Sequence, residues 1–190
     1  TNARKLDKIT YEEMLEMASL GAKVLHTRSV EMAMNHDVRL QVRSSFTDSP
    51  GTLVVNEEEI VEQQIVSGIA YSSDEAKVTL VRVPDKPGVA ATIFGPLSDA
   101  SINVDMIVQN VSEDGRATDL TFTVPKSDLD RAMALLGDMR ELIGFERAVG
   151  DANVTKVSVV GVGMRSHAGV AQTMFAALAE KSINIQVIST

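Results

Sequence analysis

The sequence predicts an α+β protein that contains tandem ferredoxin-like sandwiches, the second of them incomplete. Two observations carry this prediction. Strand and helix patterns follow the order strand, helix, strand, strand, helix, strand, and a loop–helix–strand segment recurs later in the chain. We therefore divide the 190 residues into a region at 1–55, a linker at 56–64, a first sandwich at 65–150 and a second at 151–190.

Hydrophobic periodicity supplies the elements of the first sandwich. One helix begins at Val89, where Pro96 is expected to limit or kink it, and another begins behind a Ser127 cap. A hairpin turn is expected at Ser112–Gly115. Alternating apolar positions predict the strands, which are Ile65–Tyr71, Lys77–Val83, Val104–Gln109, Asp119–Val124 and Phe145–Val149.

The repeat can be counted from two glycines. Gly169 follows Gly88 by 169 − 88 = 81 residues, and laying Val78–Gln109 over Val159–Thr190 gives 12 identities in 32 positions. The identities fall on the turn glycine, the apolar face of the helix and the entry to the next strand, which favours two copies of one unit over chance. The second copy stops inside its second strand, so we expect two strands and a helix to be missing from it.

The composition excludes several classes of function. With 18 basic and 26 acidic residues the net charge is −8, and no basic stripe is visible, so nucleic acid is not an expected partner. The absence of Cys excludes disulfides and thiol catalysis, and the three His residues lack metal-ligand spacing. No membrane-spanning run or signal-like segment is visible, so we expect a cytoplasmic protein without membrane partners. Because the chain begins with Thr1 rather than Met, we expect a processed or trimmed chain.

The region before the linker reads as the last piece of a larger domain. Thr10–Glu13 forms a capping-box pattern ahead of an apolar helical stripe, and a second short helix is predicted at Ser29–Met34. Val38–Val42 alternates as a strand. These elements are too few for a closed sheet, and the acidic run Asn56–Glu59 after them is interpreted as a solvated linker.

The loop between Pro84 and Val89 is the strongest candidate for a binding site. The start of the following helix offers free backbone N–H groups to a carboxylate, and Gly88 lets the ligand approach closely. Asp85 is placed to take an ammonium group, so a free amino acid is the ligand class that fits both poles. Polar side chains of the next strand add donors and acceptors: Asn103, Asp105 and Gln109.

Simpler interpretations remain open for single residues. Asp85 is about as suited to capping the helix, and Asn103 and Asn184 could close helix C-termini in left-handed conformations. Gly161–Gly163 lacks the full dinucleotide-binding pattern, and a tight turn at Gly163 is expected there instead. His167 is a weaker ligand candidate. No nucleophile–base–acid set and no phosphate-binding loop is present, so no catalytic residue is predicted.

The blocks Pro84–Val89 and Ile102–Met106 resemble the ACT-domain signature of enzymes of amino-acid metabolism. More specifically, the chain is similar to the C-terminal half of a bacterial aspartokinase. Asn2–Leu6, Gly21–Leu25 and Val42–Phe46 resemble the end of that family's kinase domain, and Gly163–Val170 resembles its second ACT repeat. The resemblance thus implies a kinase-domain remnant at 1–55, the first ACT domain at 65–150 and a truncated second at 151–190.

Members of this family phosphorylate aspartate with ATP and Mg, and their ACT domains bind the end products threonine or lysine. The resemblance therefore implies feedback inhibition of lysine and threonine biosynthesis. It also implies a homodimer through ACT domains or a complex with a kinase-bearing subunit. No cofactor is expected in this piece, which lacks the catalytic half and should be inactive alone. The implied effector-binding residues are Asp85, Lys86, Pro87, Gly88, Val89, Ala90, Asn103, Val104, Asp105, Gln109, Ala171, Gln172, Ile185 and Gln186.

The two copies are not expected to bind equally. The second copy has Ser166 where the first has Asp85, and Gln186 where the first has Asp105. Because both carboxylates are lost, the second copy lacks the expected ammonium partners and the first should be the stronger site. The alternative function is a ligand-free ACT-like module that only mediates oligomerisation.

Overall fold

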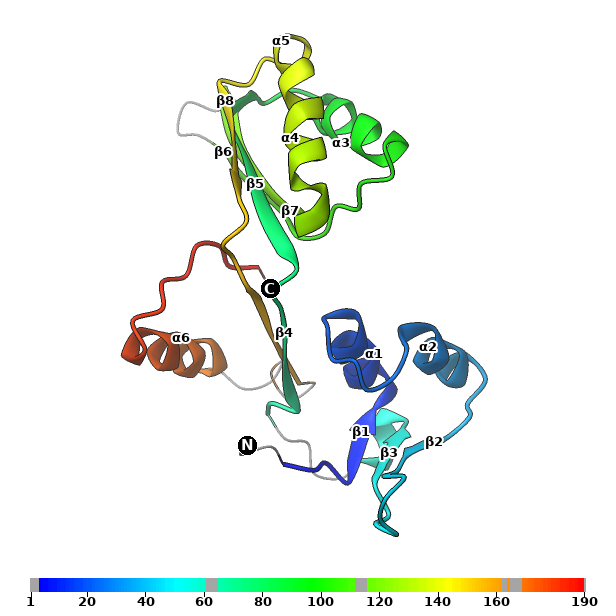
Figure 1. Cartoon of the computed structure of the whole chain (residues 1–190). Coiled ribbons are helices and arrows are strands. Elements are labelled where there is room, and N and C mark those ends of the chain that lie inside the picture. The colour runs from blue at the N-terminus through cyan, green and yellow to red at the C-terminus, as the bar shows by residue number, and fades with distance from the viewer. Residues whose placement is uncertain (1–3, 61–64, 112–115, 162–163, 165–168, 190) are drawn as a thin grey trace. The chain divides into compact units, whose positions relative to one another are not determined.

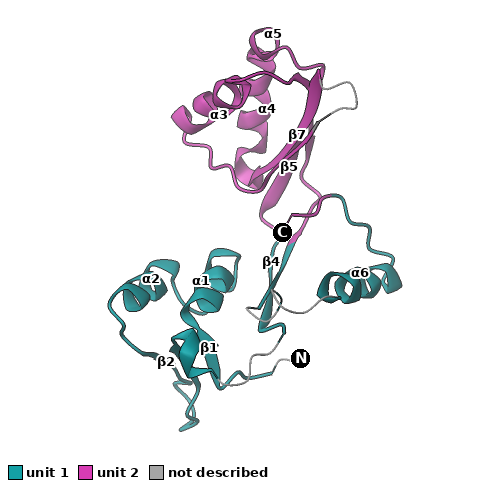
Figure 2. Ribbon diagram, turned by 180° about the vertical axis from the view of Figure 1, so that it is seen from behind, with its two compact units in different colours: residues 1–72, 157–186 teal, residues 73–156, 187–190 magenta. Residues whose placement is uncertain are grey.

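The computed structural model describes residues 4–60, 65–111, 116–161, 164 and 169–189. The chain divides into two compact units, residues 1–72 with 157–186 and residues 73–156 with 187–190 (Figure 2). The chain therefore leaves the first unit after residue 72 and returns to it at residue 157, so residues 73–156, the larger part of the second unit, are inserted in the first unit's sequence.

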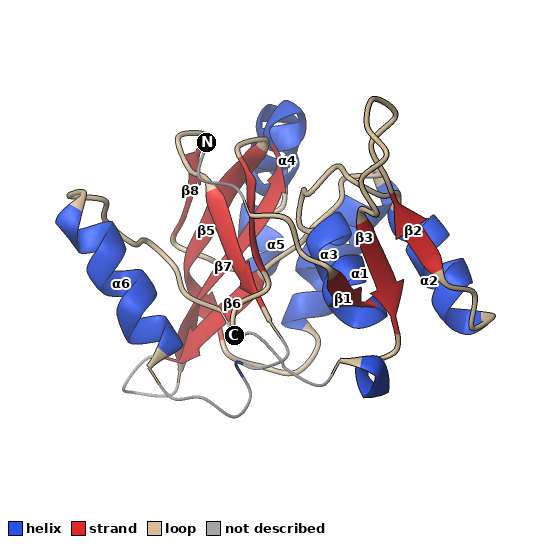
Figure 3. Ribbon diagram, turned by 90° about the horizontal axis from the view of Figure 1, so that it is seen from below, coloured by secondary structure: helices blue, strands red, loops and turns tan. Residues whose placement is uncertain are grey.

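The second unit is a four-stranded antiparallel sheet with helices on one face (Figures 1 and 3). Its strands occur in the spatial order β6-β7-β5-β8, which is the ferredoxin-like arrangement that the sequence predicts. The elements, in chain order, are β5 (Glu75–Pro84), α3 (Val89–Asp99), β6 (Ile107–Val111), β7 (Ala117–Pro125), η2 (Lys126–Asp128), α4 (Leu129–Asp138), α5 (Arg140–Ile143) and β8 (Arg147–Asp151).

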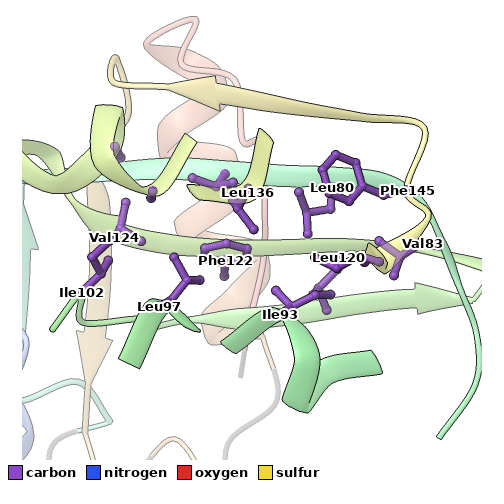
Figure 4. Close-up of a cluster of buried hydrophobic side chains, with 14 residues drawn as sticks. Leu80, Val83, Ile93, Leu97, Ile102, Leu120, Phe122, Val124, Leu136 and Phe145 are labelled. Carbon is purple, nitrogen blue, oxygen red and sulfur yellow. The ribbon is translucent and has the colours of Figure 1, made fainter. Parts of the chain in front are cut away.

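The core of this unit lies between the sheet and helices α3 and α4 (Figure 4). Alternate residues of β7, among them Leu120 and Phe122, point to the same face and meet Ile93 and Leu97 of α3. The Phe94 ring meets the Phe122 ring edge to face, with centroids 5.3 Å apart. Each fully buried aliphatic side chain contributes about 1.5–3 kcal/mol to stability. Burial of Ile93 and Leu97 against β7 therefore holds α3 on the sheet.

Two predicted helix boundaries in this unit need correction. Helix α3 continues to Asp99, three residues past Pro96, and the Pro96 carbonyl accepts from Ala100 N at 3.0 Å. The Ser127 cap is wrong. A 3₁₀ turn precedes α4, its N-cap is Asp128, and no side chain caps it. Serine is a common helix N-cap, but Ser127 lies inside the 3₁₀ turn Lys126–Asp128, where the backbone is already helical.

The first unit contains a small three-stranded sheet with two helices. The order is β1 (Lys8–Thr10), β3 (Thr52–Val55), β2 (Leu40–Val42), in which β1 and β3 run parallel and β2 runs antiparallel. The predicted capping box is present at the start of α1 (Tyr11–Ser19), and α2 spans Thr27–Asn35. The acidic linker begins with a 3₁₀ turn, η1 (Glu57–Glu59). Its side chains do not all face solvent alone, because Glu59 forms an ion pair with Arg39.

Tyr11 anchors α1 in this small core. Its ring is buried, and its hydroxyl donates to the Val38 carbonyl at 2.8 Å. Burial, followed by the negative charges of Asp37 and Glu59, raises the pKa of the Tyr11 hydroxyl. The side chain is therefore neutral at physiological pH, as the buried contact requires.

The first unit also contains a two-stranded sheet formed by distant segments, β4 (Gly68–Ser72) and β9 (Lys156–Val160). Ser67, just before β4, donates its N–H to the carbonyl of Val160 at the end of β9, at 2.8 Å. The start of one strand therefore meets the end of the other, and the pair is antiparallel. The sequence placed this strand, as Ile65–Tyr71, with the elements of the first sandwich; the structure pairs it with β9, which opens the second repeat.

Candidate functional site

The loop between β5 and α3 leads into a helix that begins at Val89, as the sequence predicts. Asp85 N–H donates to the Arg116 carbonyl at 3.1 Å, which holds the start of the loop on β7. Gly88 then adopts φ +92° and ψ −14°, a left-handed conformation that favours glycine. Thr92 bonds the Gly88 carbonyl through both its N–H, at 3.0 Å, and its hydroxyl, at 3.1 Å.

Helix α3 therefore begins without a side-chain cap. The interpretation of Asp85 as a helix cap is wrong, and the Asp85 side chain is exposed. The N–H groups of the first turn point toward the loop, where the positive end of the helix dipole favours an anion. A carboxylate could bind there without displacing a protein side chain.

The second repeat reproduces this geometry. Gly169, at φ +101° and ψ −8°, precedes α6 (Val170–Glu180), and Thr173 bonds its carbonyl through N–H, at 3.0 Å, and hydroxyl, at 3.1 Å. Residues 165–168, which include Ser166 and His167, lie outside the described residues, as does the predicted turn at Gly163. The repeat seen in the sequence is thus also a repeat of backbone conformation.

The ends of the two helices also match, but through residues that the sequence analysis did not assign. Ser101 and Ser182 have φ of +55° and +56°, and the next residue in each copy donates back into its helix. Ile102 N–H bonds the Leu97 carbonyl at 2.9 Å, and Ile183 N–H bonds the Leu178 carbonyl at 3.0 Å. The assignment of left-handed conformations to Asn103 and Asn184 is therefore wrong, because the serine two positions earlier already closes each helix.

Most of the predicted effector-binding residues are on the surface. Val89, Val104 and Ile185 are half-buried apolar residues. The remaining residues are exposed: Asp85, Lys86, Pro87, Gly88, Ala90, Asn103, Asp105, Gln109, Ala171, Gln172 and Gln186.

The predicted residues of the first repeat fall at two ends of the sheet. The loop is joined to β7 at Arg116, whereas Asp105 N–H donates to the Thr123 carbonyl at 3.0 Å. Arg116 and Thr123 are seven positions apart along extended backbone, a distance of about 23 Å. Gln109 lies between them, opposite Leu120. Within a single copy of this unit the Asp85 loop and Asp105 therefore lie near opposite ends of the sheet.

The Asp105 carboxylate has a partner that sequence reasoning missed. Its Oδ2 forms an ion pair with Lys156 Nζ, which also lies 3.9 Å from Glu75 Oε1. The Lys156 side chain is 17% exposed and Asp105 is 60% exposed, so the lysine is largely covered while the carboxylate remains accessible. A lone lysine at the start of a strand carries no pattern that would have identified this contact.

Two further features limit the chemistry of the chain. Among the residues that the structure describes, no group of three or more His, Cys, Asp or Glu side chains could hold a metal ion. The helices in those same ranges are all too short or too polar to cross a membrane.

Comparisons with known proteins match three parts of the chain. Two ACT-domain models match residues 77–141 and 157–190, and an amino acid kinase family model matches residues 1–44. An aspartokinase of Pseudomonas aeruginosa is 59% identical over 190 residues, covering 99% of this chain and 46% of that protein. The chain therefore spans about half the length of the curated relatives that it matches.

Solved structures agree with these matches. A chain in the crystal structure of aspartokinase alpha and beta subunits is 49% identical, with a TM-score of 0.60, over 66% of this chain and 81% of that one. E. coli aspartokinase III in complex with lysine and aspartate is 26% identical, with a TM-score of 0.72, over 98% of this chain and 40% of that one. Both the tandem fold and the region before it thus have counterparts in one family.

Proposed function

The chain belongs to the aspartokinase family, and on that premise we propose that it is the regulatory part of an aspartokinase. Its ACT domains would bind the end-product amino acid, threonine or lysine, and inhibit ATP-dependent phosphorylation of aspartate. The kinase reaction, with its ATP and Mg, belongs to the intact enzyme. In this chain residues 1–55 would be the end of the kinase domain, 65–150 the first ACT domain and 151–190 the start of the second.

The observation that carries this proposal is the doubled glycine-initiated helix. Gly88 and Gly169 share one backbone conformation, and within the described part of the chain no side chain caps either helix. A free amino acid carries a carboxylate that suits a helix N-terminus and an ammonium that suits a carboxylate side chain. In the first repeat Asp85 is exposed beside that terminus and supplies this second group.

A second copy of the chain would bring the Asp85 loop and Asp105 together. Within the described sheet β6 is an edge strand, so its outer hydrogen-bonding groups are available to another strand. Antiparallel pairing of β6 with the β6 of a partner places the start of one strand opposite the end of the other. Asp105, just before β6, would then approach the Arg116 end of the partner, where its Asp85 loop is held.

The second repeat would bind more weakly. Its corresponding positions, Ala171, Gln172, Ile185 and Gln186, would contribute contacts without either carboxylate of the first repeat. A solved relative, E. coli aspartokinase III, is in complex with lysine and aspartate, and another contains alpha and beta subunits. These relatives support an amino-acid effector and an assembly of chains for this protein as well.

Isothermal titration of the full-length protein with threonine, lysine and methionine tests the proposal. We expect heat and a raised melting temperature with threonine or lysine. No heat and no melting shift with any of the three would overturn the sensing function. Light scattering with and without the amino acids separates the alternative, an assembly module without a ligand, because only a sensor changes its assembly or stability with ligand.

A further inference from the structure

We propose that strand β4 couples the second repeat to the kinase-family segment, so that an inhibitory signal reaches the kinase through this strand. The inference rests on the proposed function, because it names the route by which a bound amino acid would act on the kinase. The segment matched by the amino acid kinase model, α1, β4, β9 and α6 all belong to one compact unit. Energetic coupling can be carried by elements that pack against one another, and β4 and the residues that lead into it contact both α1 and β9.

On one side, β4 is held by the first turn of α1. Ser67, which leads into the strand, donates its hydroxyl to the carboxylate of Glu13. Glu13 is only 6% exposed and is the capping-box partner of Thr10, whose N–H donates to Glu13 Oε2 at 3.3 Å. The same carboxylate therefore fixes the start of α1 and the start of β4, and neither can move without breaking a buried hydrogen bond.

Two glycines show how closely the helix and the strand approach. A Cβ added to Gly68 would lie 2.6 Å from Met17 Cε of α1. A Cβ added to Gly21, which has φ +111°, would lie 2.9 Å from the Tyr71 carbonyl oxygen. The helix and the turn after it thus contact β4 near both of its ends, through the flexible Met17 side chain at Gly68 and through backbone at Gly21.

On its other side, β4 is held by β9. Ser67 N–H donates to the Val160 carbonyl at 2.8 Å, so Ser67 bonds α1 with its side chain and β9 with its backbone. A Cβ added to Gly161 would lie 2.3 Å from the Ile65 carbonyl oxygen and 2.9 Å from Val66 Cα. The sequence related Gly161 only to a dinucleotide-binding pattern. In the structure the backbone of Ile65 and Val66 lies against Gly161, which leaves space only for a glycine.

The described contacts link α1 to β4 and β4 to β9. Strand β9 leads along the chain to Gly169 and α6, the second repeat's copy of the effector-binding helix. Closely packed elements transmit displacement because they cannot deform independently. A shift of β9 on effector binding or on assembly would therefore move Ser67, and through Glu13 it would move α1 of the kinase-family segment.

The test compares Gly161→Ala with Gly137→Ala in the full-length protein. The first substitution separates Gly161 from Ile65, whereas a Cβ at Gly137, in α4, meets nothing within 4 Å. We expect Gly161→Ala to retain at least about fivefold more kinase activity than the parent at saturating threonine or lysine. Its affinity by titration should stay within about twofold of the parent. Gly137→Ala should behave as the parent in both measurements.

Ser67→Ala is the second variant, because it removes only the hydroxyl that bonds Glu13 and is expected to fold even if Gly161→Ala does not. It should also loosen inhibition while leaving binding in place. Inhibition at parental strength in Ser67→Ala, or a loss of inhibition explained entirely by lost binding, would overturn the coupling role of β4. If the unsubstituted protein neither binds threonine or lysine nor is inhibited by them, the proposed function itself is overturned. That result differs from a variant that binds normally and is inhibited normally, which would overturn only the role of β4.

Discussion

Helices α3 and α6 begin in the same way, each after a left-handed glycine whose carbonyl is bonded twice by a threonine. Their burial differs. In α3 the side chains of Ile93 and Leu97 are fully buried, whereas α6 has no buried residue among those described, and its matching Leu178 is half-exposed. Local sequence therefore sets the helix start, whereas packing depends on the strands that the rest of the fold supplies.

The largest effect should come from matched truncations in the two helices. Leu97→Ala removes a fully buried side chain from the core of the four-stranded unit and should cost about 2–5 kcal/mol of stability. Leu178→Ala, at the matching position of α6, should cost about 1 kcal/mol or less because its side chain is already partly in water. Urea unfolding of both variants measures the difference. Equal losses would mean that α6 is as tightly packed as α3 in solution.

Asp85→Ala tests the chemical difference between the repeats. Loss of the charged partner of the effector's ammonium should cost about 1.5–3 kcal/mol of binding free energy, or roughly tenfold to a hundredfold in affinity. Asp99→Ala removes an exposed carboxylate from the other end of the same helix and is the control. Titration with threonine and lysine provides the measurement. Unchanged binding in Asp85→Ala would show that Asp85 does not contact the effector.

Gly88→Ala and Gly169→Ala test the part that the repeats share. A Cβ at either position meets nothing within 4 Å, so the cost comes only from the positive φ. Each substitution should cost about 1–2 kcal/mol, and the two costs should be similar. Gly95→Ala, where φ is ordinary and space is open, should instead be neutral or slightly stabilising. Thermal unfolding would contradict the shared conformation if only one of the two glycine variants were destabilised.

Lys156→Met should have the smallest effect, because its carboxylate partner Asp105 is largely exposed. Loss of this ion pair should cost up to about 1 kcal/mol and should matter less in high salt. Lys126→Met, which removes a lysine that bonds only the Ser73 carbonyl, is the matched control. Unfolding at low and high salt would reveal the difference. A salt-independent loss would show that the Lys156 stem, rather than its charge, stabilises the fold.

The sequence predicted the features that depend on local chemistry. Gly88 and Gly169 have no good substitute at positive φ, and Thr10 with Glu13 has few uses other than a capping box. The strand order of the ferredoxin-like unit also followed from its alternating residues. Ser101 and Ser182 were missed because serine is an uncommon choice for a left-handed helix end, and the nearby Asn drew the assignment instead.

Contacts between distant segments could not be predicted in the same way. Strands β4 and β9 pair although the four-stranded unit lies between them in the sequence. Neither strand has a local sequence pattern that would predict which strand it pairs with. The ion pair of Asp105 with Lys156 spans 51 residues of sequence. The separation of the Asp85 loop from Asp105 depends in turn on the register of β5, β6 and β7, which only the structure supplies.

The antiparallel pairing of β4 with β9 has a practical consequence for protein engineering. Because the end of β4 meets the start of β9, the segment between them begins and ends at neighbouring points of one small sheet. That segment carries the Asp85 loop, so exchanging it for a short loop or a fluorescent protein would remove the proposed first effector site and leave the first unit's chain joined. A reporter placed there would turn rearrangements of the host into an optical signal.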